Sequence, residues 1–134
     1  MRQTIETFVA QRQIKMHCDW SNSNPNINLN NWSRIATHWK CVFKLGKRRL
    51  TAYFSQGTAY SGKPAIEDVL DCLASDAAGL EDSFENWCNA YGYNTNSREA
   101  ERTYKIIQRQ SAKLAKFLGD QNAYQSLLFS TERQ

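Results

Sequence analysis

The sequence predicts an α+β fold in which a three-stranded antiparallel sheet has about five helices packed on one face. Two observations predict the sheet: residues 14–20 alternate between apolar and polar side chains, and residues 38–55 have the pattern of a hairpin. A third observation predicts the helical part, because residues 97–118 repeat apolar side chains at helical spacing. We expect one domain over residues 1–134, since a chain of this length can bury a single core.

The N-terminal part, residues 1–35, is expected to hold one helix, one strand and a loop. The helix covers residues 4–11 and buries Ile5, Phe8 and Val9. The strand covers residues 14–20, because its side chains alternate with the period of a half-buried strand. Its apolar side comprises Ile14, Met16, Cys18 and Trp20. Residues 21–31 are rich in Asn, Ser and Pro, which predicts a loop.

The hairpin at residues 38–55 is the clearest β signal in the chain. Gly46 and Lys47 suit a two-residue type II′ turn, which prefers Gly at its first central position. The resulting register pairs apolar residues on one face: Trp39 with Phe54, Cys41 with Ala52, and Phe43 with Leu50. The other face pairs Lys40 with Tyr53, Val42 with Thr51, and Lys44 with Arg49. A slip by one residue mixes the two faces, so the pattern specifies this register.

The helical part, residues 64–129, is expected to begin with two acidic helices. Pro64 suits the first turn of the first one, residues 65–77, because its ring imposes a helical φ. The second covers residues 83–91, where Ser83 is a capping residue. Their apolar stripes are Ile66, Val69, Leu70 and Leu73 in the first, and Phe84, Trp87, Cys88 and Tyr91 in the second.

The longest helix is expected over residues 97–118, where two stripes run along opposite sides. The apolar stripe comprises Ala100, Tyr104, Ile107, Ser111, Leu114 and Leu118. The basic stripe holds six cations and no acid: Arg98, Arg102, Lys105, Arg109, Lys113 and Lys116. Asn96 or Ser97 can cap the start of this helix, and Gly119 suits its end. A last short helix follows over residues 121–128, with Tyr124, Leu127 and Leu128 inward.

Charge is unevenly distributed along the chain, whose net charge is +4. Residues 65–96 hold seven acids and neither Lys nor Arg, a net charge of −7. The rest of the chain holds all 17 bases and the other six acids, a net charge of +11. The protein is therefore bipolar in sequence, which favours charged partners if the two regions are also separated in space.

The chain carries no targeting or membrane signal that we can identify. No apolar run approaches the roughly 18 residues of a membrane span, and the N-terminal MRQTIETFVAQRQ lacks the apolar core of a signal peptide. We therefore expect a cytoplasmic protein whose four cysteines are free and mostly buried.

No catalytic, metal or cofactor site is predicted. The metal-ligand residue types in the sheet are His17, Cys18, His38 and Cys41. Their odd spacing puts the members of each pair on opposite sides of a strand, so they cannot converge on one ion. Cys72 and Cys88 have no CxxC partner, and Asp68 and Asp71 suit the N-terminus of a helix more simply than acid–base work. We expect a protein that is not an enzyme and holds neither metal nor cofactor.

Two long and unusual strings, DVLDCLASD and NWCNAYGYNTNSREAE, lie between KLGKRRLTAYFSQG and KLAKFLGD. Over residues 38–119 the chain resembles a family of small accessory proteins of bacteriophages and prophages. This resemblance implies an inhibitor of a host defence system, similar to anti-CRISPR proteins. It also implies the bacterial cytoplasm as location and a host defence complex, such as a CRISPR effector, as partner. It brings no catalytic motif onto these positions.

Two functions follow as hypotheses. The first is stoichiometric binding to a protein complex, because clustered carboxylates can occupy protein surfaces that otherwise hold nucleic acid. Its candidate residues are Glu67, Asp68, Asp71, Glu81, Asp82, Arg102, Arg109 and Lys113. The alternative is nucleic-acid binding by the hairpin and the basic stripe, because cations and aromatic side chains on an open sheet face suit phosphate backbones and single strands. Its candidate residues are Lys40, Lys44, Lys47, Arg48, Arg49 and Tyr53.

Overall fold

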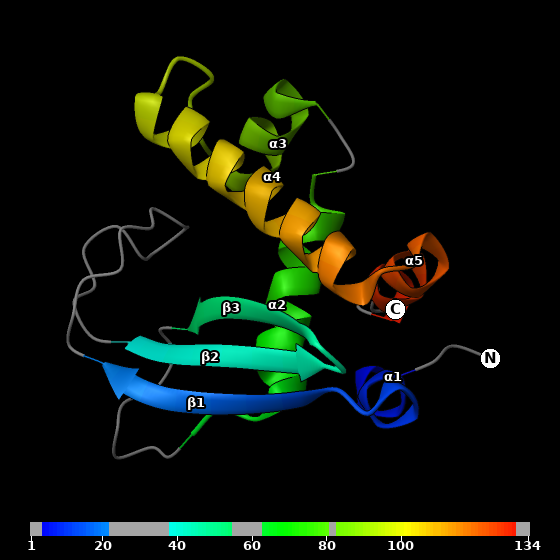
Figure 1. Ribbon diagram of the computed structural model, residues 1–134. Helices are drawn as coiled ribbons and strands as arrows, with labels where there is room; N and C mark the ends of the chain where they lie inside the picture. Colours follow the sequence, from blue (N-terminus) through cyan, green and yellow to red (C-terminus); the bar gives the residue numbers. More distant parts are fainter. Residues whose placement is uncertain (1–3, 22–37, 55–62, 81–82, 131–134) are drawn as a thin grey trace.

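The protein is seen in a computed structural model, which describes residues 4–21, 38–54, 63–80 and 83–130. Within these ranges it is α+β, as predicted, with a three-stranded antiparallel sheet and five helices (Figure 1). The elements are α1 (Ile5–Arg12), β1 (Lys15–Ser21), β2 (His38–Leu45), β3 (Arg48–Phe54), α2 (Ile66–Ala78), α3 (Phe84–Tyr91), α4 (Arg98–Leu118) and α5 (Gln121–Ser130). The loop predicted after the first strand lies outside the described residues.

The sheet has the strand order β1-β2-β3, so β1 and β3 are its two edges. All six predicted pairs between β2 and β3 are confirmed, and the turn residue Gly46 has a φ of 61°. Lys47 does not have a positive φ, which agrees with a type II′ turn. β1 pairs antiparallel with β2, where Cys18 faces Cys41 at 3.1 Å between the two Sγ atoms. All four cysteines are free, as predicted.

One face of the sheet is buried, and Figure 1 shows α2 crossing behind this face. The buried strand residues are Cys18, Trp39, Cys41, Phe43, Leu50, Ala52 and Phe54. They join one apolar core with α1, α2, α5 and the C-terminal half of α4. Because side chains alternate along a strand, the polar side chains between them point to the opposite, open face.

Helix α4 connects this main core to a second apolar cluster, which it forms with α3. The buried members of the second cluster are Trp87, Cys88, Ala100 and Ile107. The hydroxyl of Ser97 accepts a hydrogen bond from the N–H of Ala100 at 3.2 Å, and Gly119 ends the helix with a φ of 78°. Thr103 and Phe117 are also buried, outside the predicted stripe, because α4 contacts α2, α3, α5 and β3 on different flanks.

Arg48 ties the hairpin to the end of α4. Its Nη1 donates to the carbonyl oxygens of Phe117 at 3.2 Å and Leu118 at 3.1 Å. Carbonyls in the last turn of a helix have no partner within the helix, and the negative end of the helix dipole favours a cation there. This contact holds the start of β3 beside the C-terminal end of α4.

Two details of the helical part differ from expectation. α2 begins at Ile66 after an extended Ala65, so Pro64 precedes the first turn and does not form part of it. The side chain of Tyr91 is 47% exposed because α3 ends there, although its ring still contacts Trp87 at a centroid distance of 5.4 Å. Among the described helices, none combines the length and apolar character that a membrane span requires.

Candidate functional site

The open face of the sheet carries a line of three cations across the strands, which we call the cation row. Lys15 lies directly opposite Lys44, and Lys44 lies directly opposite Arg49. All three side chains are exposed. Directly opposed residues have Cβ atoms about 4.5–5.5 Å apart, and like charges in such positions destabilise a sheet. Within the described ranges none of the three forms an ion pair, so their repulsion is not offset there.

The cation row ends at a hollow between β3 and α4, which we call the edge groove because β3 is an edge strand. Its volume is about 580 Å³. It is lined by Arg48, Arg49, Leu50 and Thr51 from the strand and by Lys113, Lys116 and Phe117 from the helix. Four of these seven residues are cations and none is an acid. Arg49 belongs to both the cation row and the edge groove, so the two form one continuous basic surface.

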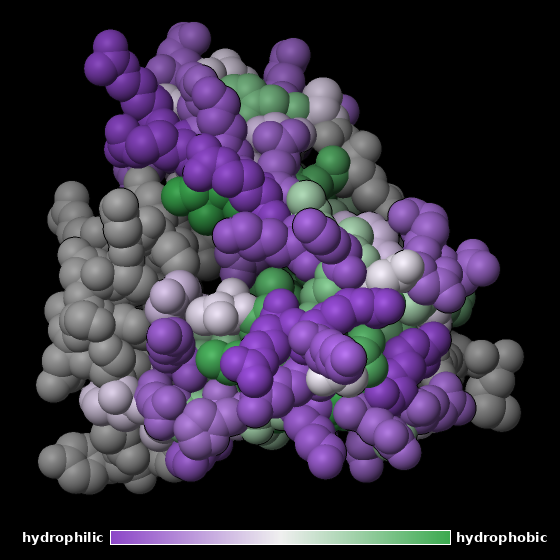
Figure 2. Space-filling model, viewed as in Figure 1, coloured by the Kyte–Doolittle hydropathy of each residue, from purple (hydrophilic) through white to green (hydrophobic). Residues whose placement is uncertain are grey.

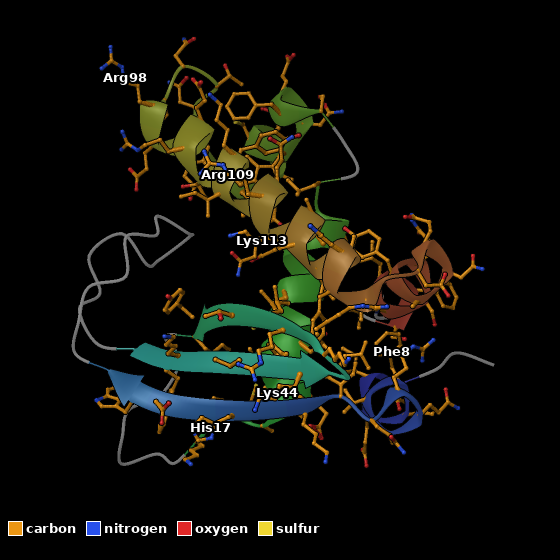
Figure 3. The ribbon with its side chains drawn as sticks, in the orientation of Figure 1. Phe8, His17, Lys44, Arg98, Arg109 and Lys113 are labelled. Carbon is orange, nitrogen blue, oxygen red and sulfur yellow. The ribbon has the colours of Figure 1, made fainter. Side chains whose placement is uncertain are left out.

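The basic stripe continues this surface along α4. All six of its side chains are exposed, as predicted. Figure 3 shows Arg98, Arg109 and Lys113 spaced along the helix, with Lys113 nearest to the sheet, and Lys44 on the open face of the sheet below. Lys105 is the one member whose charge is paired in the described structure, with Glu101 at 3.0 Å. Figure 2 shows hydrophilic residues covering α4 and the sheet on this side.

The predicted acidic residues lie elsewhere. Glu67, Asp68 and Asp71 belong to the first half of α2, the helix behind the sheet in Figure 1. Asp68 is exposed, whereas Glu67 and Asp71 are half-buried. The acidic residues and the cation row therefore lie on opposite sides of the sheet, which the sequence left open. Glu81 and Asp82 lie outside the described residues.

The predicted nucleic-acid residues gather at the hairpin with two different roles. Lys40, Lys44, Lys47 and Arg49 are exposed, and Tyr53 is half-buried on the same open face. Arg48 is different because its guanidinium already binds the end of α4. It contributes positive charge to the edge groove but is held in place by the fold.

The histidine and cysteine side chains of β1 do not converge on a metal site in the described structure. His17 Nε2 lies 3.2 Å from the Oδ1 of Asp19, but both side chains are about two-thirds exposed. Cys18 points into the core on the other side of the sheet. In the part of the chain that the structure describes, no three His, Cys, Asp or Glu side chains are grouped as metal ligands.

Sequence reasoning missed Lys15 as a member of the basic surface, and it did not place Thr51 and Lys116 together in one groove. Lys15 was assigned to the first strand, but its position opposite Lys44 depends on how β1 pairs with β2. Lys116 was placed in the basic stripe, yet nothing in its local sequence indicates that it lies beside β3. The alternating charge of the first strand was the only signal that could have pointed to Lys15.

The comparisons with known proteins bring no relative to this site. No protein family model matches the chain, and neither a curated protein nor a solved structure is detectably similar to it.

Proposed function

We propose that this protein binds nucleic acid through the sugar-phosphate backbone, using the cation row, the edge groove and the basic stripe. One observation carries the proposal: Arg49 joins a row of opposed cations on the sheet to a hollow with four cations and no acid in its lining. Opposed like charges cost folding stability, so a bound polyanion offers a physical reason for them.

The extent of the basic surface favours a polymer over a small anion. The basic stripe extends over about 27 Å from Arg98 to Lys116 at the helical rise of about 1.5 Å per residue. The cation row adds about 10 Å across three strands. Phosphates follow one another at about 3.4 Å along a strand of B-form DNA, so one chain can meet cations from several elements at once. Backbone contacts of this kind bind without reading base sequence.

A salt titration tests the proposal. Binding of a fluorescent oligonucleotide, followed by anisotropy, should weaken steeply between about 50 and 200 mM salt because cations on the protein release counterions from the phosphates. The double variant K44E/R49E should bind much more weakly and with a shallower salt slope. The control K63E reverses an exposed cation that lies outside the cation row, the edge groove and the basic stripe, so its binding should stay near that of the wild type.

Binding that is insensitive to salt, or a K44E/R49E variant that binds like the wild type, contradicts the proposal. Circular dichroism should show that both variants fold. Lys44 and Arg49 are exposed, so we expect their replacement to leave the packing of the core intact.

A second function is favoured by the separation of charge in space. We propose that the protein also acts as a bacteriophage inhibitor of a host defence complex by stoichiometric binding, as the family resemblance implies. Supporting this, Glu67 and Asp68 are in the first half of α2, on the opposite side of the sheet from the cation row. One molecule can therefore present an acidic surface and a basic surface to different parts of a nucleoprotein partner. Two outcomes oppose this proposal: the protein fails to protect a phage in a protection assay, or the purified protein shows catalytic turnover and forms no stable complex.

A further inference from the structure

The edge strand β3 offers backbone hydrogen-bonding groups to the edge groove. The turn between β2 and β3 begins at Leu45 and ends at Arg48. In a turn with two central residues, the first and last residues are joined by a backbone hydrogen bond. Hydrogen-bonded and non-hydrogen-bonded pairs alternate along an antiparallel ladder. The next pair, Lys44 with Arg49, and the pair Val42 with Thr51 are therefore non-hydrogen-bonded. The N–H and C=O groups of Arg49 and Thr51 consequently point away from β2.

These groups face the groove, and within the described ranges they keep their hydrogen-bonding capacity. Arg49 and Thr51 both line the hollow, where α4 covers the flank of β3 but cannot pair with it as a strand. Within the described ranges no hydrogen bond joins the outward N–H of Arg49 or Thr51 to another residue. The Thr51 hydroxyl lies on the same wall as these amides.

The opposite wall supplies charge. Lys113 and Lys116 are three residues apart on α4, so they lie about one turn apart on one side of the helix. Both are exposed, and neither forms an ion pair in the described structure. The groove therefore has hydrogen-bond donors on its strand wall and flexible cations on its helix wall, which is the arrangement that binds phosphate oxygens.

We infer that the edge groove is a phosphate subsite that selects single-stranded over double-stranded nucleic acid. In this subsite Lys113 and Lys116 hold one side of a backbone phosphate, and the outward amides of Arg49 and Thr51 hold the other. The inference deepens the proposed function and rests on it.

Shape is the reason for the selectivity. A volume of about 580 Å³ is within the range of pockets that enclose one small ligand. The backbone of a flexible single strand can bend into such a hollow, whereas a duplex is stiff and costly to bend, so its phosphates stay on the rim.

The test compares an oligothymidylate with a duplex of equal length at one salt concentration. The wild type should bind the single strand more tightly. The variant K113Q/K116Q should lose about tenfold in affinity for the single strand and a smaller factor for the duplex, because only the single strand enters the groove that these two lysines line. K63Q is the control, because Lys63 is exposed and lies outside the edge groove and the basic stripe. In two-dimensional NMR, the amide signals of Arg49 and Thr51 should shift on titration with the single strand and stay in place in K113Q/K116Q.

The outcomes separate the inference from the function beneath it. Equal affinity for both nucleic acids, with equal losses in K113Q/K116Q, overturns the inference and leaves the proposed function standing. If the protein binds neither the single strand nor the duplex, the inference and the proposed function are both overturned. Polyglutamate that competes as well as the oligothymidylate shows that the groove takes an acidic peptide instead, which also overturns the inference.

Discussion

At the residue scale, the cation row lowers folding stability through repulsion but favours binding to a polyanion. Lys44 lies between Lys15 and Arg49 on neighbouring strands, so it is repelled from both sides. Arg48, the residue before Arg49, has the opposite effect because it donates to two backbone carbonyls at the end of α4. Two adjacent arginines thus have different roles: Arg48 stabilises the fold, and Arg49 contributes to the basic surface.

We predict that Lys44→Glu raises the free energy of unfolding by about 0.2–1 kcal/mol at low salt, because it turns two repulsive cross-strand pairs into attractive ones. The same change should weaken binding to nucleic acid. Urea denaturation followed by tryptophan fluorescence measures the first effect, and anisotropy measures the second. High salt should reduce this gain in stability. A variant that is less stable than the wild type at low salt contradicts repulsion within the cation row.

We predict that Arg48→Ala lowers the free energy of unfolding by about 1–2 kcal/mol, because two carbonyls of α4 lose a charged donor. Arg49→Ala is the matched control and should change stability by no more than about 0.5 kcal/mol. Denaturant unfolding of the two variants side by side makes the comparison. Equal stability in both variants means that the bond between Arg48 and α4 does not support the fold in solution.

At the element scale, α2 contains a carboxyl group, that of Asp76, and burial disfavours its charged form. Burial raises the pKa of Asp76 from 3.8 to about 6. Burial, and next the charge of Asp76, raises the pKa of the neighbouring Cys72 thiol to about 11, so this thiol stays protonated at neutral pH. Between the two pKa values of Asp76 the folded chain keeps a proton that the unfolded chain has released. Stability therefore falls as the pH rises through this window.

We predict that Asp76→Asn raises the free energy of unfolding above about pH 6 by on the order of 3 kcal/mol, since one pKa unit corresponds to about 1.4 kcal/mol. The amide has a similar shape and no charge to bury. Urea denaturation across a pH series should show a decline for the wild type from about pH 4 to 6 and a flatter profile for the variant. Parallel profiles contradict this account of Asp76.

At the scale of the whole molecule, charge is divided between two sides of the sheet. The cation row, the edge groove and the basic stripe form one basic surface, while the acidic first half of α2 lies behind the sheet. A field divided in this way orients a charged partner before contact and raises its association rate. Nucleic-acid binding needs only the basic surface, whereas the second proposed function also uses the acidic residues of α2.

Two charge-reversal variants distinguish the two surfaces. R102E/R109E/K113E changes three exposed residues of the basic stripe and should remove most nucleic-acid binding. E67K/D68K changes the start of α2 and should leave nucleic-acid binding intact but reduce phage protection if the acidic surface contacts a defence complex. Asp71 is left unchanged because one of its carboxylate oxygens is buried. Anisotropy and a plaque assay give the two readouts. An E67K/D68K variant that loses nucleic-acid binding as strongly as the triple variant contradicts this division.

Features set by neighbours in sequence were predictable. The register of β2 and β3 follows from a Gly-containing turn and strict alternation, since both act over a few residues. The start of α4 at its Ser97 cap and its end at Gly119 follow from capping preferences, which are equally local. The exposure of the basic stripe follows from the spacing of the apolar residues on the opposite side of the same helix.

Only the tertiary structure decided which charges meet. Lys15 reaches Lys44 through the pairing of two strands that are far apart in sequence, and Arg48 reaches Phe117 across 69 residues. The charged residues of a sequence can be expected to be exposed to water, but the sequence does not show which of them become neighbours. Proximity depends on how apolar faces pack, and many arrangements of helices can satisfy the same hydrophobic pattern. The sequence by itself therefore determined the elements and their exposed faces, whereas packing brought β3 and α4 together into a basic groove.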